Sequence, residues 1–169
     1  MVQDDQALLS RLQAQQAEFV IIGGFCATMH GVSLVTRDLD VCCSFTLANL
    51  RRIEAAVKDL HPFHRLAANR LPLILTDELC GRLRNLYLQT DLGELDCLSE
   101  VKGVGGYEDA LGRSVVFKLS YGEFRILDID TLIVAKEAVG REHDLAAARQ
   151  LRAIKKKLSH ETPRPKPSA

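Results

Sequence analysis

The sequence has no excess of charge of either sign. Its 22 lysines and arginines balance 22 aspartates and glutamates, so the formal net charge is zero. The average composition therefore gives no reason to expect general electrostatic attraction to nucleic acid. No apolar run approaches the roughly 20 residues that a membrane-spanning helix needs, and residues 1–5 are acidic and lack a signal-peptide pattern. We expect a cytoplasmic protein with no membrane partner.

A disulfide framework is also not expected, because the chain has five cysteines, an odd number. No pairing of cysteine with histidine has the spacing of a zinc site. The cysteines lie among apolar residues, so we expect all of them to be reduced and buried: Cys26, Cys42, Cys43, Cys80 and Cys97. With 169 residues, 47% hydrophobic and 26% charged, the chain suits one globular domain with a proper core.

Hydrophobic periodicity predicts a mixture of strands and helices, and thus an α+β fold. Thr46 and Asp130 are expected to cap helices, and Gly140 to close one. We expect one domain over residues 1–160 and a disordered, proline-rich tail over 161–169. Residues 63–81 show no clear pattern beyond a loop or edge strand, and 103–106 read as a glycine-rich loop. The predicted strands are 18–22, 38–44, 82–90, 94–98, 114–119 and 123–129, and the predicted helices are 4–17, 25–30, 46–60, 130–139 and 141–158.

Two adjacent glycines, Gly23 and Gly24, follow the apolar run 19–22 directly. Glycine lets a backbone approach a ligand closely, and the helix expected next presents free amides and a positive dipole end to an anion. The Thr28 hydroxyl can add a further contact. A plain tight turn is the simpler alternative. The pattern is nevertheless typical of phosphate binding when other site residues accompany it.

Asp38 and Asp40 supply such residues at the start of a predicted strand. Side chains at positions i and i+2 of a strand point to the same face, so these carboxylates lie together. Like charges at that separation repel unless a hard cation neutralises them, and magnesium prefers carboxylate and phosphate oxygens. Glycines and carboxylates together therefore predict a site for a nucleoside triphosphate and its metal.

Asp96 is the candidate third carboxylate, in the middle of the strand 94–98. Aspartate is disfavoured in strands, so its place between Leu95 and Cys97 asks for a reason. A partly exposed structural aspartate is the alternative, and Glu94, two residues earlier on the same face, is the rival ligand.

A later block contains Lys136, Arg141 and Asp144, and one more cation, Arg37, precedes Asp38. Lysine contacts phosphate as a point charge and arginine can grip it as a fork, so these residues are candidates for phosphate binding. An exposed helix face, with Arg141 and Asp144 as an i,i+3 pair, explains the block equally well. Arg37 either pairs with a carboxylate behind the site or reaches a phosphate.

These residues, taken in order, resemble the DNA polymerase beta-like nucleotidyltransferase superfamily. The resemblance extends over about residues 18–155 and is nearest to small bacterial nucleotidyltransferases related to type IV abortive-infection (AbiEii-like) toxins. This chain has Gly24 at the position where many members of the superfamily have serine. The residues that carry the resemblance are Gly23, Gly24, Ala27, His30, Gly31, Thr36, Arg37, Asp38 and Asp40.

The resemblance implies a nucleotidyltransferase fold, with a mixed central sheet, helices packed on it and a C-terminal helical pair. It implies transfer of a nucleoside monophosphate from a triphosphate to an acceptor hydroxyl, with release of pyrophosphate. Two Mg²⁺ ions, for which Mn²⁺ can substitute, would be held by Asp38, Asp40 and Asp96. The acceptor would be the 3′ end of a tRNA, and the partner a cognate antitoxin. A small-molecule acceptor such as an antibiotic, or a non-catalytic nucleotide- or partner-binding module of the same fold, are the alternatives.

Overall fold

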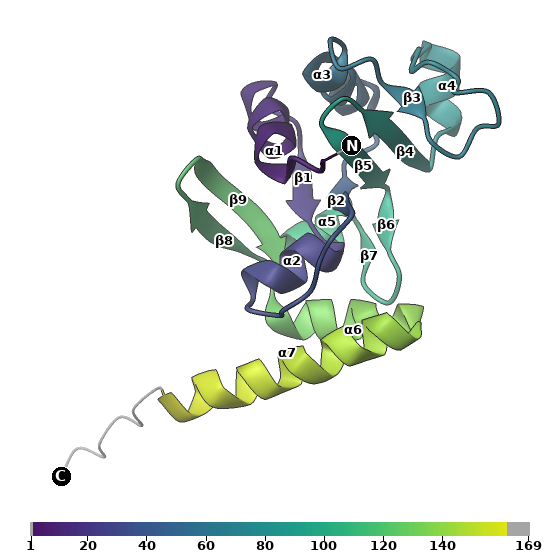
Figure 1. Cartoon of the computed structure of the whole chain (residues 1–169). Helices are drawn as coiled ribbons and strands as arrows, with labels where there is room; N and C mark the ends of the chain where they lie inside the picture. Colours follow the sequence, from purple (N-terminus) through teal and green to yellow (C-terminus); the bar gives the residue numbers. More distant parts are fainter. Residues whose placement is uncertain (1, 162–169) are drawn as a thin grey trace.

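The computed structural model describes residues 2–161 as an α+β arrangement around a mixed seven-stranded sheet (Figure 1). The sheet strands are β1 Phe19–Ile21, β2 Asp38–Cys43, β3 Phe63–His64, β4 Asn85–Thr90, β5 Gly93–Leu98, β8 Ser114–Leu119 and β9 Gly122–Leu127. A separate small hairpin contains β6 Glu100–Val101 and β7 Gly105–Gly106. The helices are α1 Asp5–Ala14, α2 Gly23–Met29, α3 Leu47–Val57, α4 Asp77–Arg82, α5 Tyr107–Gly112, α6 Ile129–Val139 and α7 Glu142–Glu161.

The order of strands across the sheet is β3-β4-β5-β2-β1-β9-β8. At its centre β2 pairs with β5 in parallel and with β1 antiparallel, and β1 continues in parallel to β9. The antiparallel pairs β4–β5 and β8–β9 extend the sheet on either side. The C-terminal helices α6 and α7 pack on each other as a separate layer below the sheet in Figure 1.

The core follows from alternation along the central strands. Leu39 and Val41 of β2, and Leu95 and Cys97 of β5, are fully buried, and they belong to one cluster of buried apolar residues that extends from Leu8 to Leu151. The residues between them, which are aspartates, face the other side of the sheet. Strand alternation therefore separates a packed apolar face from an acidic one.

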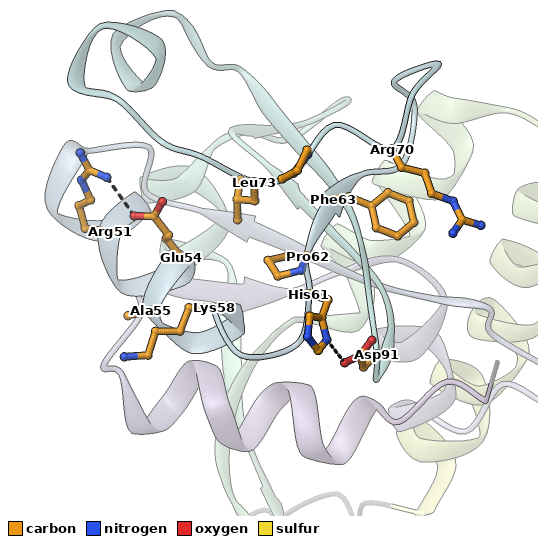
Figure 2. A pocket seen from close by; sticks show the side chains of 11 residues that line it. Arg51, Glu54, Ala55, Lys58, His61, Pro62, Phe63, Arg70, Leu73 and Asp91 are labelled. Carbon is orange, nitrogen blue, oxygen red and sulfur yellow. Dashed lines mark hydrogen bonds and ion pairs between the residues drawn. The ribbon is translucent and has the colours of Figure 1, made fainter.

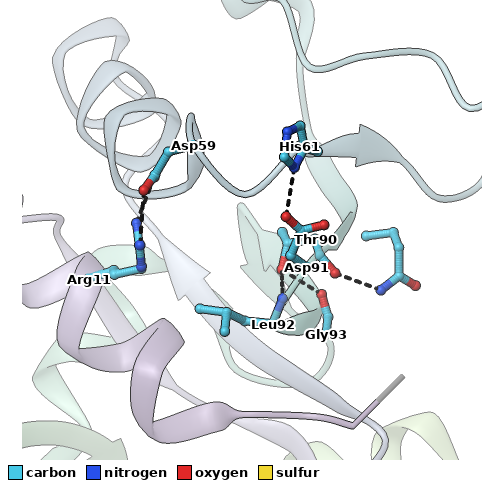
Figure 3. A network of polar contacts seen from close by, with 8 residues as sticks. Arg11, Asp59, His61, Thr90, Asp91, Leu92 and Gly93 are labelled. Carbon is cyan, nitrogen blue, oxygen red and sulfur yellow. Dashed lines mark hydrogen bonds and ion pairs between the residues drawn. The ribbon is translucent and has the colours of Figure 1, made fainter.

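Polar contacts surround the turn between β4 and β5 (Figure 3). Arg11 of α1 and Asp59, just after α3, form an ion pair at 2.7 Å, and His61 Nδ1 lies 2.7 Å from Asp91 in the β4–β5 turn. The Thr90 hydroxyl donates to the Gly93 carbonyl at 2.9 Å. The contacts of Asp91 and Thr90 hold the turn from which β5 begins, and the Arg11–Asp59 pair joins the two neighbouring helical segments.

The first residues of the chain fasten the same turn from another side. The Gln3 side chain donates to the Glu94 carbonyl at 2.9 Å and accepts from the Glu94 amide at 2.8 Å. The Asp4 amide donates to the Leu92 carbonyl at 2.8 Å. Gly93 has φ +118 and a Cβ there would lie 2.1 Å from the Gln3 side-chain oxygen, so only glycine fits.

The predicted helix ends are partly confirmed. Thr46 caps α3 by accepting from the Asn49 amide, and Gly140 ends α6 in the left-handed conformation with φ +74. The prediction for Asp130 is wrong: Asp128 caps α6 and accepts from the Thr131 amide at 2.7 Å. Strand β9 ends at Leu127, so the capping residue lies two residues earlier than expected and Asp130 lies in the first turn of the helix.

Two short helices were not predicted, α4 within the unpatterned stretch 63–81 and α5 directly after the glycines expected to form a loop. All five cysteines are free and buried, as predicted. Among residues 2–161 no helix combines the length and the apolar character that crossing a membrane requires. Glu161 ends α7, and the rest of the tail predicted over 161–169 lies outside the described residues.

Candidate functional site

Three carboxylates meet on the acidic face of the sheet. The parallel register of β2 and β5 sets Asp40 opposite Asp96 and Asp38 opposite Glu94. One carboxylate oxygen from each of Asp38, Asp40 and Asp96 lies within 4.8 Å of the other two. The structure therefore brings together the three residues that the sequence singled out as metal ligands.

The electrostatics of this group favour a positive partner. Burial, followed by the charges of Asp38 and Asp96, raises the pKa of Asp40 to about 7, although Lys136 and Arg141 act in the opposite direction. Burial also raises the pKa of Asp96, and the hydrogen bond from Arg65 only partly offsets it. Negative charge is thus in excess at the group, and either a proton or a cation relieves it.

Gly23 is required by close packing against the acidic strand, and Gly24 packs on the segment just before that strand. Gly23 has φ +66, and a Cβ at this position would lie 2.1 Å from Oδ2 of Asp40. A Cβ at Gly24 would lie 2.7 Å from Cγ2 of Thr36. Any side chain at Gly23 would therefore push Asp40 away, so the start of α2 and the acidic group depend on each other.

A cavity of about 850 Å³ opens over the acidic group, and its lining includes Gly24, Arg37, Asp38, Asp40, Asp96 and Arg141. A neighbouring cavity of about 520 Å³ shares Asp40, Tyr87, Lys136 and Arg141 with it and adds Gly23 and Asp144. Most of the residues predicted to bind phosphate thus line one continuous region with the predicted metal ligands. The region combines the three carboxylates with the cations Lys136 and Arg141, which we call the basic wall. This combination suits a ligand that carries anionic groups together with a metal.

The basic wall is organised by a buried carboxylate. Asp144 is 1% exposed; its Oδ1 accepts from Lys136 Nζ at 2.8 Å, and its Oδ2 accepts from Arg141 Nε at 2.7 Å. Burial acts to raise the pKa of Asp144, but these two hydrogen bonds outweigh it and lower that pKa. The i,i+3 pair of Arg141 and Asp144, given above as part of the alternative to phosphate binding, is present, but Asp144 is buried and does not lie on an exposed helix face. Asp144 therefore positions the two cations.

Two predicted phosphate contacts lie further out. The Thr28 hydroxyl donates to the Phe25 carbonyl at 2.7 Å, within α2, and Thr28 is not among the residues that line either cavity. Arg37 is exposed, and it lines both the acidic cavity and a smaller one beside Gln3 and Glu94. The structure thus places Arg37 at the rim and Thr28 away from the acidic group.

Sequence reasoning missed Arg65, which follows β3. Its guanidinium donates to both carboxylate oxygens of Asp96, and its Nε lies 3.3 Å from Oε2 of Glu94. The guanidinium carbon also lies 5.8 Å from the centre of the Tyr87 ring. Residues 63–81 carry no periodicity that would have pointed to Arg65. Tyr87 lies opposite Asp96 in the register, and the alternation of the strand 82–90 gave a usable signal for it.

A separate cavity of about 840 Å³ lies between α3 and the segment 61–73 (Figure 2). The Phe63 ring lies under the Arg70 guanidinium at 5.4 Å, and ion pairs join Arg51 to Glu54 and His61 to Asp91. None of the three clustered aspartates lines this cavity. It is therefore distinct from the acidic site.

Comparison with models of protein families and with curated proteins gives no match for this chain. What the chain does is accordingly inferred from its own residues and their geometry.

Proposed function

We propose that the protein is a metal-dependent nucleotidyltransferase with the fold of the DNA polymerase beta-like superfamily. It would transfer a nucleoside monophosphate from a triphosphate to an acceptor hydroxyl and release pyrophosphate. The observation that carries the proposal is the parallel pairing of β2 with β5. This pairing sets Asp96 opposite Asp40, directly beside the glycine start of α2.

The donor set fits divalent magnesium or manganese. All three side chains offer hard carboxylate oxygens, and their separation of at most 4.8 Å is compatible with ions about 4 Å apart. When bound, two such ions stabilise charge on the attacking and the leaving oxygen. Asp38 and Asp40 would hold both ions, and Asp96 would hold the second and would accept the proton of the acceptor hydroxyl.

Protein cations would receive the triphosphate. Lys136 and Arg141 line the same region as the acidic group and are fixed by Asp144, so they are preorganised rather than mobile. Gly23 and Gly24 leave the backbone of α2 accessible there. Arg37 at the rim is a further phosphate contact. Binding would rest on these fixed charges, and specificity for the base would come from elsewhere in the cavity.

The resemblance points to the 3′ end of a tRNA as acceptor, with a toxin-like role and a cognate antitoxin. The basic end of α7 would meet such an acceptor, although Arg152 and Lys155 already form ion pairs with Glu137 and Asp130. A small molecule such as an antibiotic is the other acceptor class. The acceptor is therefore identified by the product of the reaction.

The direct test incubates the protein with Mg²⁺, each labelled ribonucleoside triphosphate in turn, and total cellular RNA. The expected result is label attached to one RNA class with at least one nucleotide. The Asp38→Asn variant keeps the shape of the side chain but removes a ligand charge, so it should abolish the transfer while remaining folded. Transfer by that variant at the original rate, or no transfer to RNA or to a small-molecule pool, would refute the proposal.

One contact favours the alternative of a nucleotide- or partner-binding module without turnover. Arg65 neutralises Asp96, which is the carboxylate on which proton transfer would depend. A non-catalytic module predicts a thermal shift with nucleotide plus Mg²⁺ but no labelled product with any acceptor. A purely structural domain predicts neither.

A further inference from the structure

Arg65 takes the place at Asp96 that a cation would take, and this contact has a consequence for metal binding. We propose that Arg65 guards Asp96: one ion binds at Asp38 and Asp40, and a second binds only after the Arg65 side chain has turned from Asp96 to Glu94. The inference rests on the proposed function, because it concerns the same acidic group.

The ion pair between Arg65 and Asp96 is reinforced by charge-assisted hydrogen bonds, which are stronger than those between neutral groups. One guanidinium nitrogen, Nη2, donates to both carboxylate oxygens, and Asp96 is only 6% exposed, so water competes weakly. An arginine stays charged at every accessible pH, so it cannot release Asp96 by losing a proton. It releases the carboxylate only by moving.

The surroundings allow this movement without any change in the backbone. The Arg65 amide donates to the Tyr87 carbonyl at 2.8 Å, which anchors the main chain to β4. The side chain is a quarter exposed, and its buried Nε has no hydrogen-bond partner among the described residues that would hold it in the present position. Its several rotatable bonds can then carry the guanidinium away while the amide stays in place.

Glu94 supplies the second position for the guanidinium. Its Oε2 is already 3.3 Å from Arg65 Nε, and its side chain is 32% exposed, against 8% for that of Asp96. Glu94 lies two residues before Asp96 on the same face of β5, opposite Asp38. A charge displaced from Asp96 therefore keeps a carboxylate partner, which lowers the cost of opening the second metal position.

The test measures Mn²⁺ binding to the full chain in the absence of nucleotide, by electron paramagnetic resonance and by calorimetry. The wild type should bind one ion readily and a second weakly. In Arg65→Gln the second ion should bind about tenfold tighter or more, because a charged hydrogen bond worth about that factor no longer has to break. Glu94→Gln should weaken the second ion, because Arg65 then loses its alternative partner.

Arg37→Gln is the matched control, since it removes an equal charge that lines the cavity over the acidic group without touching Asp96. An equal gain in second-ion affinity in Arg37→Gln and Arg65→Gln would overturn the proposal, because it would show a general effect of the lost positive charge. Unchanged second-ion affinity in Arg65→Gln, with its fold verified by circular dichroism, would overturn it too. If the wild type and all variants bind no Mn²⁺, the metal site itself is refuted, and the guard falls with it.

Discussion

Asp96 lies directly opposite Asp40 in the parallel pairing of β2 and β5. A shift of one residue in this register would turn Asp96 into the apolar core, where Leu95 and Cys97 are now fully buried. The register that builds the core therefore also builds the acidic group. Folding and the candidate chemistry depend on the same strand pairing.

The first prediction concerns pH and Asp40. Its pKa of about 7 in the folded protein lies above its ordinary value of 3.8, so the folded state binds more protons than the unfolded state between these values. Stability of the metal-free protein should therefore fall as pH rises from about 4 to about 7. The measurement is the melting temperature in the presence of a chelator across that range.

Mn²⁺ should have the opposite pH dependence, because it binds the ionised carboxylate. Its stabilising effect should grow as pH rises through about 7. Asp40→Asn should raise the melting temperature of the chelated protein above that pH and should remove the Mn²⁺ effect. A chelated wild type whose stability rises steadily with pH would contradict the charge surplus.

The second prediction concerns Gly23. In Gly23→Ala, the positive φ and the approach of the new Cβ to Asp40 should together cost about 1–3 kcal/mol of stability. Urea unfolding measures this cost, and Mn²⁺ affinity should fall because Asp40 is displaced. Gly81→Ala is the matched control, since a Cβ there meets nothing within 4 Å and alanine favours the helix α4. Equal stability of the two variants would show that Gly23 is not under strain.

The third prediction concerns Asp144. Asp144→Asn leaves Lys136, whose side chain is 13% exposed, without its charged partner, so unfolding free energy should fall by roughly 3 kcal/mol. The apparent affinity for a triphosphate should fall as well, because Lys136 and Arg141 lose the group that fixes them. Equilibrium unfolding and fluorescent-nucleotide binding provide the two readouts.

Asp59→Asn is the comparison for Asp144, because it breaks an ion pair whose partners are both exposed. It should change stability little and nucleotide affinity not at all. Loss of stability without loss of nucleotide affinity in Asp144→Asn would restrict Asp144 to a structural role.

The fourth prediction tests the corrected start of α6. Asp128→Ala removes the side chain that caps the helix and should cost about 1 kcal/mol of stability. Asp130→Ala should cost less, because Asp130 is exposed and only pairs with Lys155. Thermal unfolding of the two variants separates them. A larger loss of stability in Asp130→Ala than in Asp128→Ala would show that Asp130 is the cap after all.

The members of the acidic group were predictable from short-range rules, whereas their meeting depends on the pairing of β2 with β5. Alternation on β2 set Asp38 and Asp40 on one face, and an aspartate in a strand marked Asp96. Arg65 was not predictable, because its contact depends on the pairing of β3 with β4 in a stretch without periodicity. Asp128 and Asp130 are both suitable caps, and only the end of β9 decides between them. Helix α5 was missed because the glycines before it indicated a loop.

The Gln3 side chain exchanges two hydrogen bonds with the backbone of Glu94, much as a neighbouring strand would. A segment attached ahead of Gln3, such as an affinity tag or a fusion partner, therefore begins beside the first residues of β5, close to Arg37 and Glu94. Assays of metal or nucleotide binding are best made with that extension cleaved. Affinity tags and fluorescent labels are better placed at the C-terminal end of α7, which Figure 1 shows well away from the N-terminus.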